Sequence, residues 1–334
     1  MLSRIGPVAP GPGPAIFAPM VWTGLLFLGS LVAVSVGADA LVGGASRIAT
    51  RLGVTPLVIG LTLVAFGTSA PELIVSVQAA WKGQPGLAVG NVMGSTAANV
   101  GLIIGLGALL RPLPVDRRLA LAEAPLVAAV LFLVLWFAAN GYVGTGEGVA
   151  LVAGFAGYGV WLVRTESGRI RERPALAAEF EDSGRIEGEV RLGGASIRVI
   201  VGLAALIVGG NFLVDAATDL ARTLGISEEV IGATLVAVGT SVPELASTLA
   251  AIRKGLGDLA LGNVLGSNVF NLGLVFGSAA IAAPLPLAPD VLVRQVVPAL
   301  LLSTLLMAFA FGTIGRWKGL VLLGGYALYV ARML

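Results

Sequence analysis

The sequence predicts an all-α integral membrane protein in which ten transmembrane helices form two inverted five-helix repeats. Hydrophobic residues make up 57% of the 334 residues and charged residues only 12%, whereas a soluble domain carries about 25% charged residues. Apolar runs recur along the chain at the length of about 20 residues that a bilayer-spanning helix needs. The second half of the chain also repeats the first at a constant offset.

Short polar turns separate the predicted helices, and one long polar segment lies in the middle of the chain. The ten spans fall near residues 20–46, 55–81, 86–110, 119–139, 143–164, 196–221, 227–252, 257–282, 291–313 and 315–332. They divide the chain into a tail (1–18), a first repeat (19–164), a polar loop (165–195) and a second repeat (196–334). Prolines interrupt the tail, which is therefore expected to be a flexible segment rather than a signal peptide.

Basic residues lie mostly on one side of this ten-span arrangement. That side receives the basic residues of the polar loop together with Arg47, Arg51, Arg111, Arg117, Arg118, Arg253, Lys254, Arg316 and Lys318. The other side receives Arg4, Lys82, Arg222, Arg294 and Arg332. Because cytoplasmic loops are enriched in Lys and Arg, we expect a cell (inner) membrane protein with a cytoplasmic central loop and both termini outside.

A long internal repeat defines the two halves. The segment VIGLTLVAFGTSAPEL begins at Val58 and returns as VIGATLVAVGTSVPEL from Val230, an offset of 172 residues. About 25 of the 44 positions from Val58 to Gly101 are identical at this offset, including polar residues and prolines that chance similarity of apolar helices does not match. Five spans per copy is an odd number, so the second copy enters the membrane from the opposite side, as in many secondary transporters.

Each repeat places one glutamate, Glu72 or Glu244, in the middle of its second span. A carboxylate at the centre of a bilayer costs about 2.5–3.5 kcal/mol on insertion scales, and neither half supplies a Lys or Arg in its core to pair with it. A passenger cation or a proton is the simplest counter-charge. The alternative is a pair of protonated, structural glutamates that are hydrogen-bonded between helices.

A proline, Pro71 or Pro243, directly precedes each glutamate. Proline removes a helical hydrogen bond and frees the carbonyl four residues earlier, and inside a bilayer that carbonyl needs another partner. A dehydrated cation is a suitable one. The same breaks supply hydroxyl oxygens from Thr68, Ser69, Thr240 and Ser241. The alternative is a plain proline kink that Ser and Thr side chains close by bonding to the backbone.

The spans after the breaks carry the related sequences GNVMGSTAAN and GNVLGSNVFN. Ser95 and Asn99 are four residues apart and share a helix face, and Ser267 and Asn271 repeat this arrangement. Two further asparagines, Asn91 and Asn263, are either ligands or helix-capping groups. Glycine spacing predicts close helix packing at Gly90, Gly94, Gly101, Gly105, Gly262, Gly266, Gly273 and Gly277.

The lack of cysteine and histidine leaves only oxygen ligands, which favours hard cations such as Na⁺, Ca²⁺ or Mg²⁺ over zinc or copper. Mg²⁺ resists dehydration, whereas Ca²⁺ and Na⁺ have similar radii and can occupy one cavity in turn. Competition for shared ligands couples two opposing fluxes, as in an antiporter. We expect no cofactor, no nucleic-acid partner and no enzymatic activity, and a chain that functions as a monomer in the lipid bilayer.

GTSAPE with GNVMGSTAAN, and GTSVPE with GNVLGSNVFN, resemble the two α-repeats of the cation/calcium exchanger superfamily, especially prokaryotic sodium/calcium exchangers. The resemblance covers nearly the whole chain. It implies transport of Ca²⁺ and Na⁺, four central helices around the ion sites, and sliding of the first and sixth helices past them. The ligands that it implies are Glu72, Glu244, Thr68, Ser69, Thr240, Ser241, Ser95, Ser267, Asn99, Asn271 and the carbonyls of Ala65 and Ala237.

The chain departs from the family pattern at Asn99 and Asn271, where family members often carry aspartate. Two carboxylates balance one Ca²⁺ or two Na⁺, but three Na⁺ would leave the site positive. Thr96 also stands where the other repeat has Asn268. Two readings therefore stay open: Na⁺/Ca²⁺ exchange by alternating access, and H⁺/Ca²⁺ exchange in which one of the glutamates is protonated on the return stroke.

Two other classes of transport protein compete with an antiporter. A sodium-coupled symporter for an organic solute also uses inverted five-helix repeats, but there the first helix of each repeat is broken rather than the second. A channel would use the paired glutamates as a filter, which a monomer-sized inverted repeat disfavours. Asp39 in the first span is matched by Asn211 in the other repeat, and we interpret it as a solvated or entry-path residue rather than a ligand.

Overall fold

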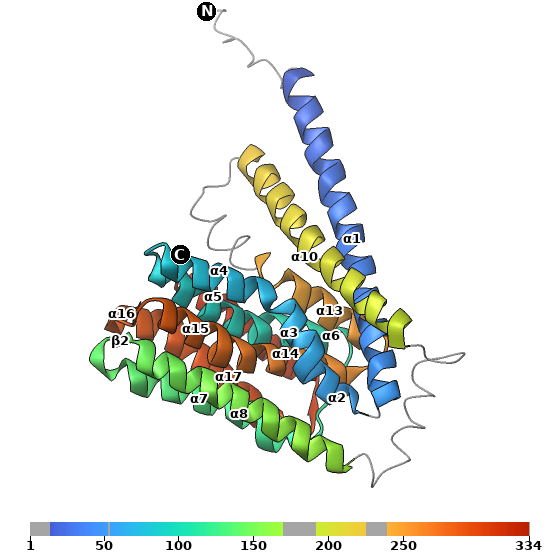
Figure 1. The fold of residues 1–334 in the computed structure, drawn as a ribbon. Coiled ribbons are helices and arrows are strands. Elements are labelled where there is room, and N and C mark those ends of the chain that lie inside the picture. Colours follow the sequence, from blue (N-terminus) through green and yellow to red (C-terminus); the bar gives the residue numbers. More distant parts are fainter. Residues whose placement is uncertain (1–13, 53, 170–191, 225–238, 334) are drawn as a thin grey trace, which may run out of the picture.

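The computed structural model describes residues 14–52, 54–169, 192–224 and 239–333, which form helices and two small ladders (Figure 1). The first half contains α1 (Pro14–Leu52), α2 (Pro56–Ile59), η1 (Gly60–Val64), α3 (Ala65–Thr68), α4 (Ala70–Trp81), α5 (Pro85–Ala98), η2 (Asn99–Ile104), α6 (Gly105–Leu110), β1 (Leu113–Pro114), η3 (Leu119–Glu123), α7 (Ala124–Phe137), η4 (Ala138–Asn140), β2 (Tyr142–Val143) and α8 (Thr145–Arg169). The second half contains α10 (Leu192–Thr223), α13 (Val242–Arg253), α14 (Gly257–Phe270), η7 (Asn271–Val275), α15 (Phe276–Ala282), β3 (Leu285–Pro286), α16 (Pro289–Val291), η8 (Leu292–Val296), α17 (Val297–Phe309), β4 (Thr313–Ile314) and α18 (Arg316–Ala331). The predicted all-α class is confirmed.

Six helical segments of the described residues are long and apolar enough to cross a membrane. They are Val21–Leu52, Pro85–Leu110, Leu119–Asn140, Leu192–Thr223, Gly257–Ala282 and Pro289–Phe309. A seventh is the pair Pro56–Thr68 and Ala70–Trp81, which is bent by 46°. The predicted seventh span, 227–252, begins outside the described residues, and the ten-span topology stays a prediction.

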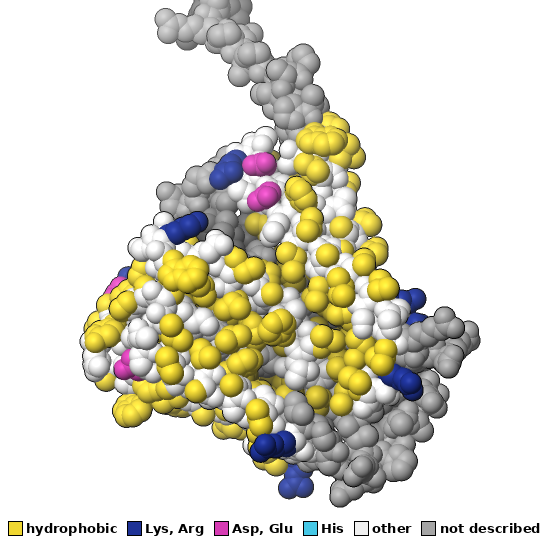
Figure 2. Space-filling view, viewed as in Figure 1, with side chains coloured by type: hydrophobic (Ala, Val, Ile, Leu, Met, Phe, Trp, Pro, Cys, Tyr) yellow, Lys and Arg dark blue, Asp and Glu magenta, His cyan; other side chains and the backbone are white. Residues whose placement is uncertain are grey.

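The central helices are buried and the flanking ones face outward. The segments Pro85–Leu110 and Gly257–Ala282 are 78% and 83% buried, whereas the long helices α1 and α10 are only 33% and 28% buried in their apolar windows. Figure 2 shows hydrophobic side chains over most of the visible face, with Lys and Arg near its margins. An apolar exterior around a buried polar centre is what a lipid solvent requires.

The helices α1 and α10 pack against each other and extend beyond the remaining helices (Figure 1). Their contact is close because Gly37 and Gly202 face each other. A Cβ atom on Gly202 would lie 2.7 Å from the carbonyl oxygen of Gly37, and one on Gly37 would lie 3.0 Å from that of Gly202. Small residues permit such approach between helices in lipid, where packing rather than hydrophobicity drives association.

Contacts of one repeat recur in the other with the partners exchanged. Strand β1 of the first repeat pairs with β4 of the second, and β2 of the first pairs with β3 of the second. The predicted close packing at Gly105 and Gly277 follows the same rule, because α6 packs on α18 and α15 packs on α8. A Cβ atom on Gly105 would lie 3.1 Å from Gly319 O, and one on Gly277 would lie 2.8 Å from Gly148 O. The prediction is wrong at Gly90 and Gly94, where a Cβ atom would come no closer than 4.0 Å to Gln295 and 3.8 Å to Tyr329.

Helix ends around the polar loop differ from the predicted limits. The helix α8 continues to Arg169 and α10 begins at Leu192, so the ordered helices extend into both ends of the segment 165–195. The second span is broken at Ser69, between α3 and α4, which confirms the break predicted before Pro71. Proline in the first turn of α4 explains this, because its ring prevents the preceding helix from continuing.

Candidate functional site

The two glutamates occupy equivalent places at the starts of broken helices. Ser69 (φ −89°, ψ 6°) precedes α4, and Ser241 (φ −91°, ψ 8°) precedes α13. A proline follows within the first turn of each helix, and Glu72 and Glu244 lie one residue later. The first turn of a helix carries unsatisfied N–H groups and a partial positive charge, which stabilises a carboxylate there.

Both carboxylates are fully buried. Ser69 Oγ donates to Glu244 Oε1 at 2.8 Å, so a hydroxyl of the first repeat contacts the glutamate of the second. Among the residues that the structure describes, Glu244 Oε2 and both carboxylate oxygens of Glu72 have no hydrogen-bond partner. Buried acceptors without partners are costly, and a bound cation would supply the missing interaction.

The threonines of each break reach the asparagine of the opposite repeat. Thr68 Oγ1 lies 3.4 Å from Asn263 Oδ1, and Thr240 Oγ1 lies 3.2 Å from Asn91 Oδ1. The two pairs are related by the offset of 172 residues. The Thr68 hydroxyl also lies 3.1 Å from the carbonyl of Val64 on its own helix. These crossed contacts bring the two breaks to one place in the fold.

The amide groups of Asn91 and Asn263 are engaged between helices. Asn91 Nδ2 donates to Ser76 Oγ at 2.9 Å, and Asn263 Nδ2 donates to Ser247 and Thr248 at 3.1 and 2.9 Å. Since each side-chain oxygen also faces a threonine of the other repeat, both ends of each amide have partners. In this structure these asparagines connect α4 to α5 and α13 to α14.

The helices α5 and α14 bring further oxygens to the same centre. Ser95 Oγ lies 3.2 Å from Ser241 Oγ. Asn99 Nδ2 donates to Asn268 Oδ1 at 2.9 Å across the two repeats. Among the described residues of these helices and of the turns that follow them, five buried atoms have no hydrogen-bond partner: Thr96 Oγ1, Asn99 Oδ1, Ser267 Oγ, and both polar atoms of the Asn271 side chain.

A π-helical turn begins at each of the two predicted ligand asparagines, Asn99 and Asn271. The turn η2 starts at Asn99 and η7 starts at Asn271, again at the offset of 172 residues. Such turns insert one residue into the helical hydrogen-bond ladder and are frequent at functional sites. No pattern in the sequence predicts these turns.

Eleven of the twelve predicted ligand residues lie among the described residues, and Ala237 lies outside them. The backbone carbonyl of Ala65 accepts the N–H of Ser69 at 3.0 Å at the break. The hydrogen bonds described above link the other predicted side chains to the opposite repeat, except those of Glu72, Ser267 and Asn271. Among the described residues there is no cluster of three or more Asp or Glu side chains, so the centre holds two carboxylates and several neutral oxygens.

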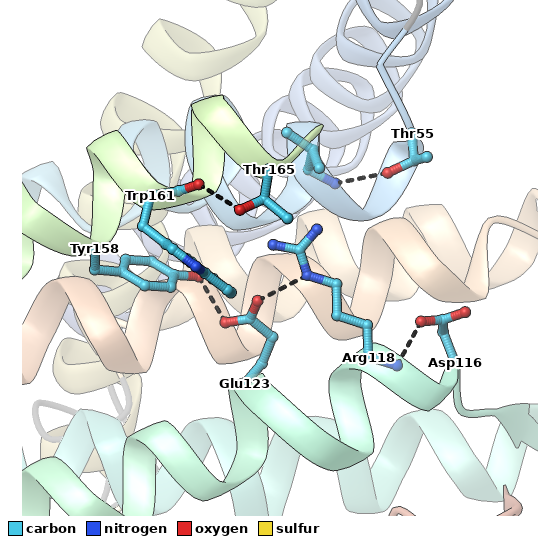
Figure 3. A network of polar contacts seen from close by, with 8 residues as sticks. Thr55, Asp116, Arg118, Glu123, Tyr158, Trp161 and Thr165 are labelled. Carbon is cyan, nitrogen blue, oxygen red and sulfur yellow. Dashed lines mark hydrogen bonds and ion pairs between the residues drawn. The ribbon is translucent and has the colours of Figure 1, made fainter. Parts of the chain in front are cut away.

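A third buried carboxylate, Glu123, was not identified from the sequence (Figure 3). Tyr158 Oη donates to Glu123 Oε2 at 2.6 Å, and Arg118 Nε lies 3.3 Å from Glu123 Oε1. The Arg118 guanidinium also stacks over the Trp161 ring at 5.3 Å. The repeat gives no sign of this residue, because Glu123 ends η3 and its equivalent at the end of η8 is Val296. Its place within the predicted span 119–139 was the available signal.

The sequence is similar to those of known proteins over nearly its whole length. The model of the sodium/calcium exchanger protein family matches residues 22–164 and 195–334. The putative antiporter CaxA of Alkalimonas amylolytica is 38% identical over 310 residues, covering 91% of this chain and 96% of CaxA. The sodium/calcium exchanger MaX1 of Methanosarcina acetivorans is 35% identical over 341 residues, covering 92% of this chain and 97% of MaX1.

Solved structures agree with this assignment. The sodium-calcium exchanger NCX_Mj soaked without Na⁺ and Ca²⁺ superposes with a TM-score of 0.80 at 33% identity, covering 93% of this chain and 99% of that one. The same exchanger soaked with 2.5 mM Na⁺ and 0.1 mM Ca²⁺ gives a TM-score of 0.79 at 33% identity, covering 93% and 98%. The resemblance that the repeated motifs indicate is thereby confirmed: the chain is a multi-pass membrane protein of the sodium/calcium exchanger family.

Proposed function

We propose that this cation antiporter exchanges Na⁺ for Ca²⁺ by alternating access, with both ions using one centre between the repeats. The observation that carries the proposal is the pair of buried glutamates, Glu72 and Glu244, three of whose four carboxylate oxygens have no hydrogen-bond partner. Two negative charges in this setting balance one Ca²⁺ or two Na⁺. MaX1 and NCX_Mj, which are similar to this chain, are named as sodium/calcium exchangers, and this supports Na⁺ as the coupling ion.

The proposed ligands are the oxygens that converge from the two breaks and from α5 and α14. They are Glu72, Glu244, Thr68, Ser69, Thr240, Ser241, Ser95, Ser267, Asn99, Asn271 and the carbonyls of Ala65 and Ala237. Carboxylate, hydroxyl, amide and carbonyl oxygens suit Ca²⁺, which accepts six to eight oxygens in a flexible shell. Ordered competition between ions for this set would couple their fluxes.

The proposed topology is ten spans in two inverted repeats, with both termini outside and the central loop in the cytoplasm. The exchanged pairings β1–β4 and β2–β3, and the exchanged helix contacts, support it. Because the chain has no cysteine, single cysteines report their side cleanly. Lys82→Cys should react with a membrane-impermeant maleimide added outside, and Arg316→Cys only after permeabilisation; the reverse pattern would refute the orientation.

Transport in proteoliposomes tests the coupling ion. Uptake of ⁴⁵Ca²⁺ should follow an imposed outward Na⁺ gradient and should not respond to a K⁺ or a pH gradient. Glu72→Gln and Glu244→Gln should each abolish it, since each removes one of the two charges that balance the ion. Retained ion flux in both variants would overturn the carrier mechanism.

Proton coupling is the second candidate, and one observation favours it. Asparagine at positions 99 and 271 leaves only two carboxylates at the centre, and a carboxylate can exchange its cation for a proton. Under that mechanism ⁴⁵Ca²⁺ uptake would follow a pH gradient and be indifferent to Na⁺. The same vesicle experiment therefore separates the two antiporters.

A further inference from the structure

A relay of two hydrogen bonds connects Asn99 to the backbone of its own helix through the opposite repeat. Asn99 Nδ2 donates to Asn268 Oδ1 at 2.9 Å, and Asn268 Nδ2 donates to the Thr96 carbonyl at 3.5 Å. All three residues are fully buried. The relay therefore lies away from water and is not in competition with solvent for these bonds.

The relay fixes which end of the Asn99 amide faces the centre. A backbone carbonyl can only accept a hydrogen bond, so Asn268 has to present its Nδ2 group to Thr96. Its Oδ1 atom then faces Asn99, which has to present its own Nδ2 group. The oxygen of Asn99 is left over, and in the structure it is buried without a partner. An otherwise reversible amide orientation is thus determined by one fixed acceptor.

The remaining oxygen belongs to the proposed ion centre. Asn99 lies one helical turn after Ser95 and on the same face, and Ser95 Oγ is 3.2 Å from Ser241 Oγ of the other break. An amide oxygen held in this position is a neutral ligand for a hard cation.

Among its described residues, the second repeat has no equivalent relay. Thr96 occupies the position that corresponds to Asn268, and Asn271, which corresponds to Asn99, has no hydrogen-bond partner for either end of its amide. The Thr96 hydroxyl is also without a partner. Two asparagines at equivalent sequence positions therefore differ in how firmly their oxygens are held.

We propose that Asn268 is a positioning residue that holds the Asn99 oxygen as a preorganised ligand of the transported cation. The proposal rests on the proposed function, because it assigns a role at that same centre. Holding a ligand in its bound orientation removes an ordering cost from ion binding. Asn271 pays this cost when an ion arrives, so the two halves contribute unequally to affinity.

Equilibrium binding of ⁴⁵Ca²⁺ to the purified full-length protein, together with vesicle transport, tests the proposal. Asn268→Leu removes the relay at similar volume and should weaken Ca²⁺ binding about 3- to 10-fold while the maximal transport rate stays within about twofold of wild type. In an Asn99→Ala background, the same substitution should produce no further loss. Ser303→Ala, which removes a buried hydroxyl that bonds only to the carbonyl of Ala299 on its own helix, should leave binding unchanged.

Unaltered Ca²⁺ affinity in Asn268→Leu would overturn the proposal, as would an equal loss in the presence and absence of the Asn99 side chain. Asn268→Thr places the residue of the first repeat at this position and provides a second variant with the same expected loss if the leucine variant does not fold. Failure of the proposed function looks different, because the wild-type protein itself would then not bind Ca²⁺.

Discussion

Ser69 Oγ of the first repeat donates to Glu244 Oε1 of the second at 2.8 Å, whereas the equivalent Ser241 bonds to Ser95. Among the described residues, the Glu72 carboxylate has no hydrogen bond. The two glutamates are therefore equivalent in sequence and different in environment. Hydrogen bonds to a charged group contribute about 1.5–3 kcal/mol, against about 0.5–1.5 kcal/mol for a neutral pair.

Alanine at each serine should reveal this difference. Ser69→Ala removes the bond to the carboxylate and should destabilise the ion-free protein by about 1.5–3 kcal/mol. Ser241→Ala removes a bond between neutral hydroxyls and should cost less. Thermal unfolding of both variants in Na⁺-free, Ca²⁺-free detergent solution measures the effect, and equal losses of stability would contradict the inequivalence of the two glutamates.

Helix contact at the centre leaves no room at Gly266. A Cβ atom there would lie 2.7 Å from the carbonyl oxygen of Leu61 and 2.8 Å from the Cβ atom of Ala65. Gly266→Ala should therefore push α14 away from η1 and α3, at a cost of about 1–3 kcal/mol as in other overpacked cores. Ca²⁺ affinity should fall as well, because the same contact aligns the breaks.

Gly257 at the start of α14 is the matched control. A Cβ atom there would meet only Pro114 at 4.0 Å, so Gly257→Ala should leave both melting temperature and Ca²⁺ affinity close to wild type. If Gly266→Ala and Gly257→Ala had the same melting temperature and Ca²⁺ affinity, the contact of α14 with η1 and α3 would have to adjust to the added methyl group without cost.

An ion pair joins the outer helix pair to the central helices in this structure. Lys254 Nζ, just after α13, lies 3.4 Å from Asp39 Oδ1 on α1. Helix α1 packs on α13, and α10 makes no comparable contact with α4, its counterpart by the repeat. The counterpart residues are Asn211 and Lys82, so the equivalent pair has only one charge.

Asp39→Asn should therefore shift the balance of the two access states away from the one in this structure. The side chains of Asp39 and Lys254 are 57% and 39% exposed. The shift should therefore be small, about two- to fivefold, as for surface ion pairs. Asn211→Asp should shift the balance in the opposite direction. Maleimide labelling of single cysteines from each side measures the populations of the two access states. If Asp39→Asn and Asn211→Asp shifted these populations in the same direction, the proposed role of the ion pair would be contradicted.

Buried Glu123 should support the fold rather than ion binding. Tyr158→Phe removes a 2.6 Å hydrogen bond to its carboxylate and should cost about 1.5–3 kcal/mol of stability. Ca²⁺ affinity should not change, because Tyr158 and Glu123 connect α8 to the junction of η3 and α7. A weakened Ca²⁺ affinity at intact stability would instead place this network in the transport path.

The repeat predicted which residues are equivalent but not which residues touch. The identity of Thr68 with Thr240 and of Asn91 with Asn263 marks all four as special. Their contacts, however, run from each threonine to the asparagine of the other repeat. That crossing depends on how the two halves are rotated against each other, which the helical spacing within one half does not encode.

Sequence reasoning missed the buried carboxylate of Glu123, which has no copy in the other repeat. The structural equivalent of Glu123 is Val296. The difference between Asn268 and Thr96 is visible in the sequence, but the hydrogen bonds that Asn268 makes are not. The π-helical turns depend on tertiary packing, because local sequence preference does not distinguish them from ordinary helix. The glutamates, by contrast, were identified because each combines a high burial cost with an adjacent proline.

The charge of the centre can be raised at one asparagine more easily than at the other. Asn271 has no hydrogen bonds to lose, so Asn271→Asp adds a third carboxylate to the centre. A buried carboxylate without a counter-charge is unfavourable, and the variant should recruit a further monovalent cation. Its Na⁺ dependence of ⁴⁵Ca²⁺ uptake should become steeper, and transport should become more responsive to membrane potential.

Asn99→Asp should behave differently, because a carboxylate oxygen would then replace the Nδ2 group that donates to Asn268 Oδ1 at 2.9 Å. Two acceptors at that distance repel each other, so this variant should lose stability and Ca²⁺ affinity rather than gain a cation. Vesicle uptake at varied Na⁺ and imposed potential compares the two variants directly. Unchanged ion dependence in Asn271→Asp would show that the number of carboxylates does not set the number of ions carried.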